Sequence, residues 1–188
     1  MSKTSKFFAL QVLFPVMIAS AVSAQMSDGS PCVVGETVLV SAGSGIATLT
    51  QNADEKIVTL TGRDGQSVAL SAAQFAALPQ YAVANENEFM DGLNCYQGPL
   101  GRDVLALIGA GPGDTVNLTA INDYLVEAPA VHMFDYDVIF ATEINGERLS
   151  VRDKGPIWVV YPQSDQAELR DPIYSTYMVW QLSRVDLN

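Results

Sequence analysis

The sequence predicts one α+β domain that is mostly β, with mixed sheets and a few short helices. Apolar, β-branched runs recur along the chain and end at Gly, Pro or Asn residues, as strands do. Only residues 71–78 and 100–108 combine helical spacing with terminal signals. No repeat, charge run or linker divides residues 25–188, and that length suits a single domain with its own core.

The elements follow one another with clear turn and cap signals. The expected strands share short apolar runs bounded by turn residues, and they cover residues 37–42, 57–61, 67–70, 115–121, 138–144, 148–151, 157–161 and 174–187. In the first helix Ser71 fits the N-cap, and Gln74 completes a capping box. The second helix carries an apolar stripe and stops at the glycine-rich residues 109–113. Residues 81–84 are expected to be extended, and residues 85–88 form a polar break within otherwise apolar surroundings.

Residues 1–24 are expected to be a cleaved signal peptide. Lys3 and Lys6 precede an apolar segment at 7–22, and Val22-Ser23-Ala24 supplies small residues of a cleavage pattern. A retained membrane anchor is the alternative, although a spanning helix needs about 20 apolar residues. Cleavage would leave residues 25–188 in the periplasm, with no direct membrane insertion after processing.

The chain is strongly acidic, and this balance limits its partners. It has 10 Lys and Arg residues against 21 Asp and Glu residues, for a formal net charge of −11. Such a surface repels nucleic acid and anionic lipid. We therefore expect no nucleic-acid partner, and a neutral or cationic small molecule or a basic protein instead.

Residues typical of metal and nucleophilic catalysis are scarce. Cys32 and Cys95 are the two cysteines, and export would permit a disulfide between them, although the sequence leaves that pairing open. Two cysteines and the single histidine, His132, are too few for a usual zinc site. No nucleophile elbow, HExxH motif or P-loop is present, and we expect no catalytic residue.

Residues 151–162 form the most informative segment. Arg152, Asp153 and Lys154 end abruptly at Gly-Pro, and an apolar run that contains Trp158 follows. The charges therefore lie where a loop enters a sheet, and they could hold an anion or a polar heterocycle beside a flat aromatic face. A solvated turn before a buried strand explains the same residues.

The order of several motifs resembles the molybdopterin-binding domain of sulfite-oxidase-type oxidoreductases. The corresponding segments share the family's turn and apolar residues, and they lie at 58–70, 97–105, 120–124, 138–149, 154–162 and 179–185. The resemblance implies a sulfite-oxidase-like molybdopterin-binding fold for residues 25–188.

Departures from the family pattern concern the metal. The family holds molybdenum through a cysteine thiolate, a soft ligand suited to such a metal. The corresponding position here lies near Glu86, and Cys95 is out of register. Trp158 and Val179 replace an arginine and a lysine of the family. The resemblance thus implies a retained pocket without the metal or the redox chemistry.

The same pattern is similar to stand-alone periplasmic members of the superfamily that lack the ligand cysteine. These proteins bind pterins without molybdenum, and some are the sensory partners of a membrane-bound diguanylate cyclase. The resemblance implies a non-catalytic, non-metallated pterin site in which Trp158 stacks on the ring. The residues expected around it are Arg152, Asp153, Lys154, Asp123, Tyr124, Asn85 and Glu86.

Other readings of these residues remain open at this point. Trp158 and Trp180 can be core residues, Arg152 and Asp153 a surface ion pair, and Asp123 a turn residue. The alternative function is a molybdopterin-dependent oxidoreductase in which Cys95 reaches the metal. A structural interaction domain that uses the fold as a scaffold is a third reading.

Overall fold

The computed structural model describes residues 29–45 and 56–188 of the chain. The expected signal peptide, residues 1–24, lies outside the described residues. None of the helices within the described ranges has the length and apolar character to cross a membrane.

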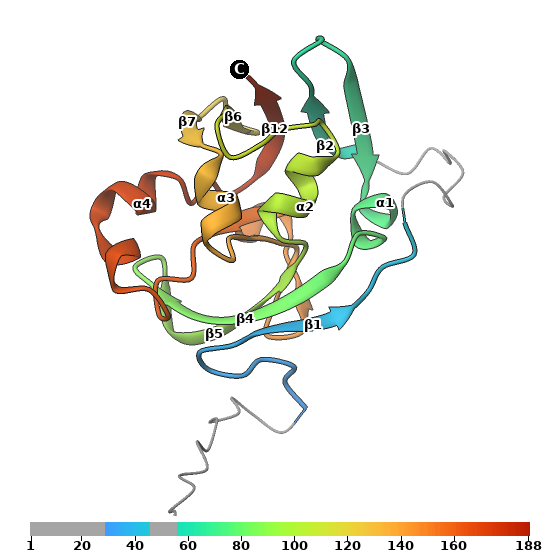
Figure 1. The fold of residues 1–188 in the computed structure, drawn as a ribbon. Helices are drawn as coiled ribbons and strands as arrows, with labels where there is room; N and C mark the ends of the chain where they lie inside the picture. The colour runs from blue at the N-terminus through green and yellow to red at the C-terminus, as the bar shows by residue number, and fades with distance from the viewer. Residues whose placement is uncertain (1–28, 46–55) are drawn as a thin grey trace, which may run out of the picture.

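In the described part of the chain, two five-stranded sheets and one two-stranded sheet form the body (Figure 1). The first sheet has the order β1-β4-β5-β9-β10, with strands Thr37–Ser41, Gln80–Asn87, Met90–Gly98, Glu143–Ile144 and Glu147–Arg148. The second has the order β3-β2-β12-β6-β7, with strands Ser67–Ser71, Lys56–Thr61, Leu182–Leu187, Thr115–Ala120 and Leu125–Pro129. The third pairs β11 (Trp158–Val160) with β8 (Ile139–Ala141). Because β12 pairs with β2 in parallel and with β6 antiparallel, the expected mixed sheets are confirmed.

Four short α-helices connect these strands within the described residues, and they are α1 (Ala72–Ala76), α2 (Gly101–Ala106), α3 (Val131–Asp135) and α4 (Pro172–Thr176). The predicted capping box is present, because Ser71 Oγ accepts from the Gln74 amide and Gln74 Oε1 accepts from the Ser71 amide. Figure 1 shows α1, α2 and α3 between the two large sheets, with α4 at one side. The 3-10 turns η2 (Val151–Asp153) and η3 (Ala167–Arg170) precede β11 and α4.

The prediction of one long strand at residues 174–187 is wrong for its first half. Asp171 accepts a hydrogen bond from the Ile173 amide, and Pro172 begins α4 with a preset φ angle. The apolar residues Met178 and Val179 are buried, but they lie in a loop beside β11. Hydrophobic burial in a loop thus gave the same pattern as a strand, and only Leu182–Leu187 extends as β12.

The polar residues 85–88 cover the end of β4 and the start of a hairpin turn. β4 continues to Asn87, turns back at once, and pairs with β5 as an antiparallel hairpin. Asn87 fixes this turn, because its Oδ1 accepts from the Phe89 amide and its Nδ2 donates to the Tyr96 hydroxyl. Side-chain hydrogen bonds of this local type make polar residues suitable for turns.

The expected strand at 138–144 is divided between two sheets. β8 pairs with β11, whereas β9 pairs with β5 and with β10. The chain changes sheet at Thr142, whose amide donates to the Gln97 carbonyl. A Cβ atom on Gly98 would overlap the Phe140 carbonyl, so the glycine permits the close approach of β5 and β8.

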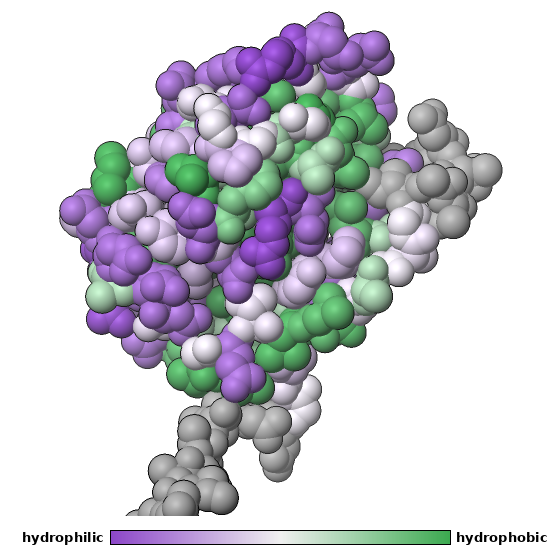
Figure 2. Space-filling view, viewed as in Figure 1, coloured by the Kyte–Doolittle hydropathy of each residue, from purple (hydrophilic) through white to green (hydrophobic). Residues whose placement is uncertain are grey.

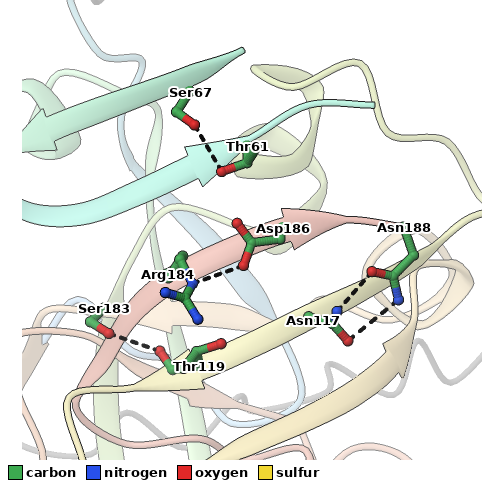
Figure 3. Close-up of polar contacts among 8 residues, drawn as sticks. All are labelled: Thr61, Ser67, Asn117, Thr119, Ser183, Arg184, Asp186 and Asn188. Carbon is green, nitrogen blue, oxygen red and sulfur yellow. Dashed lines mark hydrogen bonds and ion pairs between the residues drawn. The ribbon is translucent and has the colours of Figure 1, made fainter. Parts of the chain in front are cut away.

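The exposed side of the second sheet is polar and internally bonded. Figure 3 shows the Thr61–Ser67 hydroxyl pair, the Arg184–Asp186 ion pair and the paired amides of Asn117 and Asn188. In Figure 2 hydrophilic and hydrophobic residues mix over the visible face, and hydrophobic residues gather where Figure 1 draws β1. The polar sheet face is solvated, and the core lies on its other side.

Cys32 and Cys95 form a disulfide bond, with a Cα–Cα distance of 5.7 Å. Both cysteines are buried in a small cluster with Ala82 and Ala84, separate from the main core. The pairing that the sequence left open is therefore present. It ties the N-terminal arm to the middle of β5.

Removing this bond should destabilise the fold. Replacing both cysteines by alanine should lower the free energy of unfolding by about 2–5 kcal/mol, because the unfolded chain regains the freedom of a long loop. Urea unfolding of the oxidised wild type and of Cys32→Ala/Cys95→Ala gives the comparison. A reductant should shift the wild type and leave the variant unchanged, and equal midpoints for the two oxidised proteins would contradict the prediction.

Candidate functional site

Three hollows surround the tip of the β4–β5 hairpin, at residues 86–90. The aromatic hollow, of about 280 Å³, is lined by Phe89, Asn122, Tyr124, Ser175, Thr176, Met178, Val179 and Trp180. The polar hollow, of about 550 Å³, is lined by Glu86, Asn87, Glu88, Met90, Gly92, Gln163, Ser164, Arg170, Pro172 and Ser175. The mixed-charge hollow, of about 500 Å³, is lined by Met90, Ile144, Asn145, Glu147, Arg148, Leu149, Asp153 and Lys154.

Trp158 does not offer a stacking face, which corrects the prediction made for it. Its side chain is fully buried, with ring centroids 5.5 Å from Tyr96 and 6.2 Å from Phe89. The indole Nε1 donates to the Met178 carbonyl at 3.2 Å, so its polar atom is satisfied inside the core. Trp158 opens β11, all of whose residues are buried, and it packs as a core residue.

The accessible indole is that of Trp180, which sequence reasoning placed in a strand. Its side chain is 38% exposed, lines the aromatic hollow and lies edge-on to Phe89 with centroids 5.2 Å apart. Recognition of the Asp171-Pro172 helix start would have placed Trp180 in a loop after a helix. Asn122, Phe89 and Arg170 were also missed, because the first two lie in turns and Arg170 lies in the short η3 segment.

Lys154 lies at the junction of the hairpin and the tryptophans. Its Nζ is 5.4 Å from the Trp158 ring centroid, 5.7 Å from that of Trp180 and 3.6 Å from Met90 Sδ. A cation at this distance is attracted to the faces of both indoles. Among the described residues, Lys154 forms no ion pair. The ammonium therefore positions Trp180 and Met90 at the cleft.

The other two members of the charged segment differ from Lys154. Asp153 lines the mixed-charge hollow and accepts from Ser150 Oγ at 2.7 Å. Arg152 is exposed on η2, lines none of the three hollows, and forms no ion pair with a described residue. Since successive residues of a helical turn point in different directions, the structure separates Arg152 from Lys154.

The expected pair Asp123 and Tyr124 is likewise divided. Tyr124 lines the aromatic hollow with an exposed ring, and its hydroxyl donates to the Thr176 carbonyl at 3.0 Å. Asp123 occupies the left-handed region at φ 64° in the turn after β6 and does not line that hollow. The geometry therefore supports a structural role for Asp123 in this turn.

Asn85 and Glu86 also have separate roles. Asn85 is fully buried, donates to the Tyr161 carbonyl at 3.0 Å and accepts from the Ser164 amide at 2.9 Å. The side-chain amide of Asn85 thus links β4 to the loop after β11. The backbone amide of Glu86 donates to Ser164 Oγ at 2.8 Å, and Glu86 lines the polar hollow.

Cys95 cannot supply a thiolate to this cleft. Tyr96 packs on Trp158 in the main core, and Cys95, as its neighbour on a pleated strand, points to the opposite face. The chain has two cysteines, and both form the disulfide. The described residues contain no group of three His, Cys, Asp or Glu side chains placed to hold a metal. These residues do not fit the thiolate-bound molybdenum of sulfite-oxidase-type enzymes.

His132 lies in an aromatic cluster with Tyr161, Tyr174 and Tyr177. Its ring centroid is 5.3 Å from Tyr174 and 5.4 Å from Tyr177, and its Nδ1 lies 3.2 Å from the Tyr161 hydroxyl. Burial raises the pKa of Tyr161, so the phenol keeps its proton. Burial also lowers the pKa of His132, against a smaller opposing effect of Asp135. A neutral histidine thus packs against Tyr174 and Tyr177, neither of which lines one of the three hollows.

Protonation of His132 should oppose folding. Its pKa is lowered from 6.5 in the folded protein, so the unfolded chain binds the proton first as the pH falls. The contribution of His132 to stability is complete above pH 6.5 and declines as the pH falls below that value. Urea unfolding at pH 7.5 and 5.5 should show a smaller pH effect in His132→Asn than in wild type. Identical pH effects would contradict the prediction, since both proteins share the same carboxylates.

Comparisons with known proteins bear on the fold. No protein-family model matches the sequence, and no curated protein matches it. Among solved structures, the sulfane dehydrogenase SoxCD from Paracoccus pantotrophus is similar, with a TM-score of 0.54 and 15% sequence identity. The likeness covers 74% of this chain, and the chain spans 39% of that protein chain. At this identity the likeness concerns the fold alone, and the chain has an α+β fold that resembles a sulfite-oxidase-like domain.

Proposed function

We propose that this protein binds a pterin in the aromatic hollow and does no chemistry on it. The observation that carries the proposal is the exposed indole of Trp180, which lies with Phe89 and Tyr124 around a hollow of about 280 Å³. The sulfite-oxidase-like fold and the sequence resemblance both support a pterin as the ligand class. The stacking residue in this proposal is Trp180, in place of Trp158.

The chemistry of the hollow suits a flat ring with polar edges. An indole face stacks on a heterocycle, and a few convergent polar groups then fix its orientation. Asn122 uses its Oδ1 to accept from the Tyr124 amide, which leaves its NH₂ group as a donor at the rim. Ser175 adds a hydroxyl to the same rim. A bicyclic ring can therefore be held from its face and from its edge.

The position of the cysteines supports binding without molybdenum. Cys95 lies on the far face of β5 and is bonded to Cys32. An oxidoreductase with a thiolate-held metal would need this bond broken and the strand rotated. The carboxylates at the cleft, Glu86 and Glu88, are hard ligands and do not replace a thiolate.

We also propose the periplasm as the site of action and a membrane signalling protein, such as a diguanylate cyclase, as the partner. The disulfide supports an oxidising compartment. The sequence resemblance to stand-alone pterin-binding proteins supports the sensory role. In this proposal the ligand-bound cleft is the state that the partner recognises.

Calorimetric titration with a reduced pterin tests the binding proposal. The wild type should bind one molecule, and Trp180→Ala should weaken binding by about fivefold, because a stacked aromatic pair contributes on the order of 1 kcal/mol. Trp180→Phe should recover part of the affinity. Val68→Ala, an exposed apolar change on β3, should bind as the wild type does. Equal affinity in Trp180→Ala and wild type would refute stacking on this residue.

Metal analysis of protein purified from the periplasm is the companion measurement. We expect a bound pterin without molybdenum. Stoichiometric molybdenum in the native protein would overturn the non-metallated proposal and favour the oxidoreductase.

A further inference from the structure

We infer that Met90 is an oxidation site, and that its sulfoxide draws the Lys154 ammonium away from the two indoles. The oxidant is a small hydroperoxide such as hydrogen peroxide. The inference does not depend on pterin binding, because it concerns contacts that the protein makes by itself. It gives the cleft a sensitivity to oxidants in addition to any ligand.

Met90 is the accessible methionine among residues 29–45 and 56–188. Its side chain is half-buried at the start of β5, and it lines both the polar and the mixed-charge hollows. The other two methionines of these ranges, Met133 and Met178, are 0% and 3% exposed. A peroxide must reach the sulfur in order to react, so exposure selects Met90.

The sulfur of Met90 has a cation beside it. Lys154 Nζ lies 3.6 Å from Met90 Sδ, and Lys154 forms no ion pair with a described residue. The same ammonium lies 5.4 Å from the ring centroid of Trp158 and 5.7 Å from that of Trp180. A thioether sulfur is a weak acceptor, so the ammonium is shared between Met90 and the indole faces.

Oxidation turns this weak acceptor into a strong one. A lone pair of the sulfur attacks one oxygen of the peroxide, an S–O bond forms as the O–O bond breaks, and the proton on the transferred oxygen passes to the leaving oxygen. The sulfur loses two electrons and the peroxide is reduced, so the products are the sulfoxide and one water molecule. A hydrogen bond from an ammonium to a polar oxygen is stronger than a cation–π contact at an accessible site. The Lys154 ammonium therefore moves to the sulfoxide oxygen.

The backbone confines this response to side chains. Lys154 occupies the left-handed region at φ 71°, and its carbonyl accepts from the Gln181 amide at 2.8 Å. Gln181 directly follows Trp180, so the two loops stay joined when the ammonium moves. Phe89, the neighbour of Met90 at the hairpin tip, lies edge-on to Trp180 with centroids 5.2 Å apart. Oxidation of Met90 thus removes a cation from Trp180 without displacing its loop.

Treatment with hydrogen peroxide, followed by mass-spectrometric peptide mapping, tests the site. We expect Met90 to gain one oxygen atom about tenfold faster than Met133 and Met178, because the two buried sulfurs react only when the structure opens locally. Tryptophan emission should rise in step with the oxidation of Met90, because an ammonium beside an indole quenches its excited state. Met90→Leu should show no rise.

Lys154→Gln separates the proposed response from a general effect of oxidation. This variant removes the ammonium and keeps the sulfur, so before treatment it should emit as the oxidised wild type does. Its emission should not respond to peroxide, although Met90 is still oxidised. Arg148→Gln removes another cation of the mixed-charge hollow and should respond as the wild type does. Methionine sulfoxide reductases should restore both the thioether and the original emission.

The outcomes that contradict the inference are distinct. Oxidation of Met133 or Met178 as fast as that of Met90 would overturn the site. Emission that ignores the oxidation of Met90, or a response that persists in Lys154→Gln, would overturn the role of the ammonium. Emission that stays altered after the sulfoxide has been reduced would assign the change to another lesion and overturn the response proposed for Met90.

Discussion

The alternation of side chains along the β4–β5 hairpin is the constraint on which the cleft depends. Ala84 pairs with Cys95 and Val83 pairs with Tyr96, so one face carries the disulfide cluster and the other carries the aromatic core. A shift of one residue in register would exchange these faces. The bond to Cys32 and the packing of Tyr96 on Trp158 therefore hold the same register from two sides. The hairpin tip, which lies between the three hollows, takes its position from that register.

The backbone beside Trp180 leaves the regular elements at three points. Asp123, Lys154 and Gln181 occupy the left-handed region, with φ angles of 64°, 71° and 53°. The Gln181 amide donates to the Lys154 carbonyl, and the Gln181 carbonyl accepts from the Ile121 amide, both at 2.8 Å. Non-glycine residues in this conformation are uncommon and are found often at functional sites. Three segments far apart in sequence thus meet beside Trp180 and present its indole to solvent.

Local signals in the sequence predicted much of the fold and little of the site. The capping box at Ser71 and the strands expected at 57–61 and 67–70 depend on neighbouring residues, and they were confirmed. Burial of Trp158 and exposure of Trp180 depend on which loops cover each ring, and residue type does not encode that. Tyr124, Lys154 and Glu86 were expected around one ligand, but each of them lines a different one of the three hollows. Asn85 was expected to bind the pterin, but its side chain is buried and its amide ties two segments together.

The closeness of the two tryptophans has an optical consequence. Their ring centroids are 6.4 Å apart, with an angle of 61° between the planes. Electronic transitions of indoles at such separations couple, so the excited states belong to the pair and not to either ring. The near-ultraviolet circular dichroism of the folded chain should therefore contain an exciton contribution that depends on the angle between them. A small rotation of the solvent-facing indole would alter the optical activity of its buried neighbour as well.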